Sequence, residues 1–183
     1  MSPTMSPALA RALDEIDSAT TGMSDDQLAW HPDGKWSAGD ILEHLSLTFS
    51  GTIVGMHKRL ESGHPTNRKA TAKERLRSLI LTRFGYFPRG RAAPEGVVPQ
   101  GVRPREAFNS IRQNLIAMDK AIADCESHFG SGIKFANHPV LGPLTAWEWR
   151  RFHYVHTRHH MREIRALRER MKSASMTPQA PRD

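Results

Sequence analysis

The sequence predicts an all-α protein in which four long helices form a four-helix bundle, with a short extra helix and a long Gly/Pro-rich loop. Apolar residues recur at three- and four-residue steps in four separate segments, and capping residues, glycines and prolines divide these segments. With 183 residues, 38% hydrophobic and 25% charged, the chain suits one domain with a substantial core. We expect a single helical-bundle domain over residues 1–171 and a disordered C-terminal tail over 172–183.

The N-terminal half contains signals for two of the long helices. Apolar residues predict the first helix over residues 8–20: Leu9, Leu13 and Ile16. Ser24 and Gln27 have the spacing of a capping box, which predicts a short helical turn that ends before Pro32. Ser37 is a good N-cap for a long helix that ends near Glu61.

The rest of the chain contains the loop and the other helices. A shorter basic helix is predicted over residues 72–84, and four glycines and three prolines make residues 85–101 a loop. An apolar stripe predicts a helix over 105–128. Residues 133–135 have extended character without an identifiable partner strand. Thr145 and Glu148 form a second capping box, which opens a helix that runs to about Met171.

Charge and composition limit the classes of partner. The net charge is +7, and residues 58–105 alone carry +9. Such a segment is typical of a nucleic-acid interface, of a site for an acidic small substrate, or of a solvated face. No nucleic-acid reader motif or interleaved aromatic platform accompanies it, so nucleic acid is the least favoured partner. The sequence has no apolar run that predicts a signal peptide or a membrane span, and we expect a cytoplasmic protein.

Histidines supply the strongest functional signal. His156 and His160 lie four residues apart, so on a helix their imidazoles share one side and could both bind a Zn²⁺-class ion. From this spacing alone, two buried imidazoles hydrogen-bonded to carbonyls or carboxylates are the better interpretation. A metal site needs a third ligand from another helix, and the best candidate is His44, on the flank of its helix's apolar stripe. A zinc peptidase would need a glutamate where Thr157 stands.

The residues around these histidines resemble the DinB-like (DinB/YfiT-like) superfamily of metal-binding four-helix bundles. The resemblance is carried by Trp36-Ser37 with Ile41-Leu42-Glu43-His44-Leu45, and by His156-Thr157-Arg158-His159-His160. It extends over about residues 9–167. Residues 138–145 and 152–156 further resemble an uncharacterised bacterial branch of that superfamily. The resemblance implies that His44, His156 and His160 hold one divalent ion, and it favours a metal site over simple hydrogen bonding.

Three histidine ligands leave a coordination position open, as in catalytic metal sites. Imidazoles suit Zn, Ni or Fe, and the ion could activate water or a thiol. The resemblance further implies a low-molecular-weight thiol cofactor, an S-transferase or related hydrolase activity, and a homodimer. Our lead hypothesis is a metal-dependent, thiol-dependent transferase; the alternatives are a non-catalytic, stress-related metal-binding protein and, less favoured, a nucleic-acid-binding protein.

Further residues are candidates for supporting a ligand or for binding the substrate. His153 and His159 lie at the two edges of the stripe that contains the histidine pair, and Glu163 follows His160 by one turn. Arg89 and Arg91 lie in the predicted loop, where they could bind the carboxylates of an anionic small-molecule substrate. A solvated basic face is an equally good interpretation of each arginine taken singly.

Overall fold

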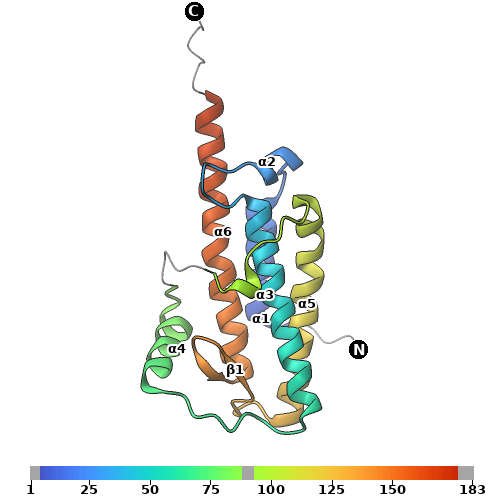
Figure 1. Cartoon of the computed structure of the whole chain (residues 1–183), viewed down its shortest axis with the longest axis vertical. Coiled ribbons are helices and arrows are strands. Elements are labelled where there is room, and N and C mark those ends of the chain that lie inside the picture. Colours follow the sequence, from blue (N-terminus) through green and yellow to red (C-terminus); the bar gives the residue numbers. More distant parts are fainter. Residues whose placement is uncertain (1–4, 88–92, 177–183) are drawn as a thin grey trace, which may run out of the picture.

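The computed structural model describes residues 5–87 and 93–176, and this part of the chain is mostly helical, as predicted (Figure 1). The elements in chain order are α1 (Pro7–Thr20), α2 (Asp25–Ala29), α3 (Ala38–Glu61), α4 (Ala72–Phe84), the 3-10 turn η1 (Glu95–Val97), α5 (Pro104–Phe129), β1 (Ala136–His138), β2 (Gly142–Leu144) and α6 (Ala146–Met176). None of the helices in these ranges is long and apolar enough to cross a membrane.

Capping boxes define where four of the helices begin. In each, a Ser or Thr side chain accepts a hydrogen bond from the backbone three residues later, and the side chain at that later position bonds back to the cap. The pairs are Ser24–Gln27, Ser37–Asp40, Thr71–Glu74 and Thr145–Glu148. The boxes predicted at Ser24 and Thr145 are therefore confirmed.

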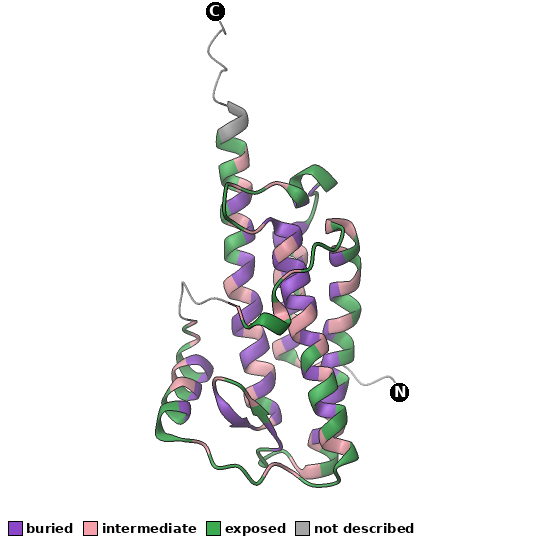
Figure 2. Cartoon of the chain, in the orientation of Figure 1, coloured by how far each residue is buried: buried purple, intermediate pink, exposed green. Residues whose placement is uncertain are grey.

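The four long helices α1, α3, α5 and α6 lie alongside one another, and their facing sides form the core (Figure 2). The most extensive packing pairs α3 with α5 and α1 with α6. The core is built mainly from aliphatic side chains that are almost completely buried, among them Leu9, Ile16, Leu42, Leu45, Ile111, Leu115, Met118, Ile122 and Ile164. Cys125 is buried among them, as expected for a structural thiol, and burial raises its pKa to about 11.

Two features differ from the predicted secondary structure. The extended segment has a partner: β1 and β2 form an antiparallel hairpin in which Ala136 pairs with Leu144. The strand therefore begins after residues 133–135, which we expected to be extended. Helix α6 continues to Met176, five residues beyond the expected end near Met171, because nothing in its sequence breaks the helix there.

Candidate metal centre

Three histidines from two helices converge in the middle of the molecule. His44 lies in the second turn of α3, and His156 and His160 lie on successive turns of α6. Their exposed fractions are 4%, 5% and 8%. Nε2 of His156 lies 3.3 Å from Nε2 of His44 and 3.0 Å from Nε2 of His160. The structure thus brings together the three residues predicted as ligands, and the group could hold a metal ion.

Hydrogen bonds on the far side of two rings fix where their protons lie. Nδ1 of His44 is 2.7 Å from the carbonyl oxygen of Val97, and Nδ1 of His160 is 2.7 Å from the Glu163 carboxylate. Both partners are acceptors, so in a neutral ring each Nδ1 carries the hydrogen and each Nε2 presents a lone pair. Both lone pairs face Nε2 of His156, which can donate at most one hydrogen. Without a cation, at least one buried acceptor has no donor.

The donor set fits a divalent transition metal. Around a tetrahedral Zn²⁺ with bonds of about 2.1 Å, ligand nitrogens are about 3.4 Å apart. The two Nε2–Nε2 distances given above are slightly shorter than this, so a small outward movement of the rings would admit the ion. Three imidazoles complete three of four positions and leave the fourth open to water or substrate.

Burial keeps the ligands in the form that binds metal. It lowers the pKa of His44 to about 4, although the bond to Val97 opposes the shift. Burial also holds the pKa of His156 well below 6.5, and the neighbouring imidazoles add to the effect. Burial alone would raise the pKa of Glu163, but the hydrogen bond from His160 and the nearby rings lower it overall. Near neutral pH the His44 and His156 rings are therefore uncharged while Glu163 is ionised.

A buried carboxylate, Glu43, positions the segment that contacts His44. Glu43 is only 4% exposed, and it holds residues 100–102, which follow Val97 closely in the chain. Its oxygens accept three backbone N–H bonds at 2.7–3.2 Å, from Gln100, Gly101 and Val102. The centroid of the Trp36 ring lies 5.1 Å from that of the His44 ring. We did not single out Glu43 from the sequence, although an acid in the apolar run Ile41–Leu45 was a usable signal.

Aromatic rings enclose His156. Phe87, which follows α4, stacks on the His156 ring with 5.0 Å between centroids, and Phe152 stacks on the same ring at 5.4 Å. Nδ1 of His156 has no hydrogen-bond partner within the described ranges. The contact of Phe87 with a candidate ligand has no signal in the sequence and comes from the structure.

The other predicted residues divide into three sets. His159 and Glu163 lie beside the centre, with His159 Nε2 3.5 Å from a Glu163 oxygen. Together with His160 they form a second group that could hold an ion, although it shares a ring with the first. His153 is fully buried and is not among these ligands; its Nε2 lies 3.1 Å from the hydroxyl of Thr52. Arg89 and Arg91 lie outside the described residues.

Comparison with known proteins gives a family but no activity. Residues 6–167 match the model of a family described as "Protein of unknown function (DUF1569)". No curated protein and no solved structure matches the chain. The matched range covers most of the sequence and includes all three histidines of the centre. The chain therefore belongs to the DUF1569 family of proteins of unknown function.

Proposed function

We propose that this protein binds one divalent transition-metal ion, Zn, Ni or Fe, through His44, His156 and His160, and uses it in thiol-dependent transfer chemistry. The observation that supports metal binding most strongly is the pair of Nε2 lone pairs that face a third buried imidazole. The thiol, and a DinB/YfiT-like four-helix bundle as the fold, are supported by the sequence resemblance described above.

A bound ion of this class would supply Lewis acidity and lower the pKa of a water or thiol at its open position. The protein's own residues prepare the site. Glu163 keeps the proton of His160 on Nδ1, and the Val97 carbonyl does the same for His44. The low exposure of all three rings excludes bulk water, which strengthens electrostatic interactions with whatever occupies the site.

Metal analysis of purified variants tests the binding proposal. We expect about one ion per chain in the wild type, by the three-ligand argument, and loss of the ion in His156→Ala and in His44→Ala. His57→Ala is a matched control, because His57 is exposed on the same helix as His44. Circular dichroism checks that each variant is folded. Equal metal content in His156→Ala and wild type would contradict the proposal.

One observation favours a second candidate, a metal-binding protein without catalysis: each ligand is less than a tenth exposed, and Phe87 covers His156. The two functions differ in turnover. A transferase moves a low-molecular-weight thiol onto an electrophilic acceptor when loaded with metal and loses that activity when the metal is removed. A loaded protein that shows no turnover with any thiol tested would support the non-catalytic function.

A further inference from the structure

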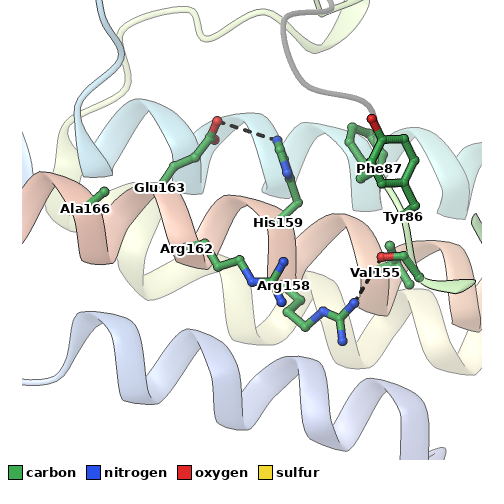
Figure 3. A pocket seen from close by; sticks show the side chains of 9 residues that line it. Tyr86, Phe87, Val155, Arg158, His159, Arg162, Glu163 and Ala166 are labelled. Carbon is green, nitrogen blue, oxygen red and sulfur yellow. Dashed lines mark hydrogen bonds and ion pairs between the residues drawn. The ribbon is translucent and has the colours of Figure 1, made fainter.

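A cavity of about 720 Å³ opens beside the metal centre (Figure 3). It lies between α6 and the residues that follow α4, and it is lined by Gly85, Tyr86, Phe87, Val155, Arg158, His159, Arg162, Glu163 and Ala166. Two of its lining residues, Phe87 and Glu163, contact candidate ligands. Phe87 stacks on His156, and Glu163 accepts the hydrogen bond from His160. A molecule in this cavity would therefore be separated from two of the candidate ligands by a single side chain each.

Two arginines make the cavity wall positive. Arg158 and Arg162 are one turn apart on α6 and extend to the same side of the helix in Figure 3. The Arg158 guanidinium donates to the Gly85 carbonyl at 3.1 Å, which fixes its position. Arg162 is exposed and makes no ion pair or hydrogen bond with the described residues. Among the described residues that line the cavity, Glu163 is the only acid, and it is already engaged by His160 and His159.

The remaining lining is apolar and aromatic. Tyr86 is 60% exposed, although a tyrosine ring usually packs against other groups, and Phe87 lies next to it. Val155 and Ala166 add apolar surface on α6. Pockets for small molecules combine such surface with a few polar groups that fix orientation. Here the polar groups are the two guanidinium groups, the Glu163 carboxylate and the His159 ring, and the guanidinium groups pair well with carboxylates and phosphates.

We propose that this cavity binds a small organic acid, in which a carboxylate or phosphate pairs with Arg162 and Arg158 and a flat apolar part lies on Tyr86 and Phe87. The inference deepens the proposed function by naming the class of substrate. It rests on the proposed function only for the reaction of the bound acid at the metal, and not for binding of the acid in the cavity. The anion itself is held by residues of the cavity, not by the ion.

Calorimetric titration of zinc-loaded and metal-free protein tests the assignment. The probes are benzoate, phenyl phosphate, inorganic phosphate and the uncharged benzyl alcohol. We expect benzoate or phenyl phosphate to bind both forms about tenfold more tightly than inorganic phosphate and benzyl alcohol. Whichever of benzoate and phenyl phosphate binds more tightly identifies the preferred anionic group as a carboxylate or a phosphate.

Variants locate the bound anion. Arg162→Ala should weaken binding about tenfold or more, while its metal content stays at the wild-type level. Arg170→Ala is the matched control, because Arg170 is exposed two turns further along α6. Arg158→Lys keeps the charge but removes the planar fork, and we expect it to weaken binding less than Arg162→Ala does.

The outcomes separate this inference from the metal proposal. If no probe binds while the wild type holds one ion, the inference is wrong and the proposed function stands. Anion binding that is lost in His156→Ala but kept in Arg162→Ala would place the anion on the metal, which also overturns the inference. Anion binding that depends on Arg162 in a protein that takes up no metal would support the cavity assignment and contradict the proposed metal function.

Discussion

Glu43 and His44, consecutive residues on α3, bind the same segment of chain at two places. The Glu43 carboxylate accepts backbone N–H groups from residues 100–102, and Nδ1 of His44 donates to the carbonyl of Val97. The carboxylate therefore fixes the segment whose carbonyl sets the tautomer of His44. Because metal ligands are commonly oriented by such outer contacts, we expect the position of this segment to affect how tightly the candidate site binds a metal ion.

Glu43→Gln tests this coupling. The variant keeps the size of the side chain but removes the negative charge that accepts three N–H bonds, so we expect a loss of about 1–3 kcal/mol in the free energy of unfolding. Metal affinity should fall about tenfold because the Val97 carbonyl is less well placed. Urea unfolding and zinc titration measure the two effects. Glu61→Gln, an exposed acid on the same helix, should change neither; an unaltered zinc affinity in Glu43→Gln would disprove the coupling.

Glu163→Gln tests the contact on the other side of the site. The amide can either donate to or accept from Nδ1 of His160, so it no longer holds that ring in the tautomer with a free Nε2 lone pair. We expect a drop of roughly 10–100-fold in metal affinity. Competition with a chelator of known affinity measures it, and Glu169→Gln, an exposed acid of α6, is the control. Equal affinities in the two variants would show that Glu163 is only a surface charge.

The helices and their starting points could be predicted because the signals are local. Each capping box can be recognised within four residues of sequence, as in the pairs Ser24–Gln27 and Thr145–Glu148. The hairpin was missed because its strands have three residues each, and pairing Ala136 with Leu144 is a contact between segments that show no alternating pattern. Gly51 and Gly55 follow His44 on α3, and the sequence alone does not show whether another helix packs against them; the structure leaves open space beside both.

The candidate site was predictable only where spacing or resemblance revealed it. The four-residue step from His156 to His160 predicts a shared face. Periodicity made His44 only a candidate on the flank of its helix, and the resemblance then implied that it is the third ligand. The groups that support these rings come from distant parts of the chain. Val97 lies 53 residues from His44 in the sequence, and Phe87 reaches His156 from the end of another helix. No local pattern encodes such tertiary contacts, so they required the structure.

Two histidines outside the candidate ligands, the buried His153 and the partly buried His138, should make the metal-free protein sensitive to acid. Burial lowers the pKa of His153 to about 3 and that of His138 to about 4. In the unfolded chain these groups take up protons near pH 6.5. The free energy of unfolding therefore has its full value, as far as these two histidines are concerned, above about pH 6.5. It declines as the pH falls toward 4, by up to about 1.4 kcal/mol per pH unit for each histidine.

His153→Gln isolates one of these groups without touching a candidate ligand. The difference in unfolding free energy between pH 7 and pH 5 should shrink by roughly 1–2 kcal/mol in the variant. Urea unfolding at the two pH values measures it, and the comparison is valid even if the substitution lowers stability at both. His57→Gln, at an exposed position, should keep the wild-type pH dependence. An unchanged pH dependence in His153→Gln would mean that His153 does not take up a proton on unfolding.

Two glycines of α3 should respond oppositely to the same substitution. A Cβ at Gly39 would lie 2.7 Å from Cβ of Pro104 and 3.0 Å from its Cα, so Gly39→Ala must push α3 away from the start of α5. We expect a loss of about 1–3 kcal/mol in the free energy of unfolding. At Gly51, an exposed position of α3, nothing lies within 4 Å of the added Cβ, and Gly51→Ala should stabilise the helix by up to about 1 kcal/mol. Urea unfolding compares the two variants directly. Equal effects would mean that helix propensity, and not the close approach of α3 to α5, decides both.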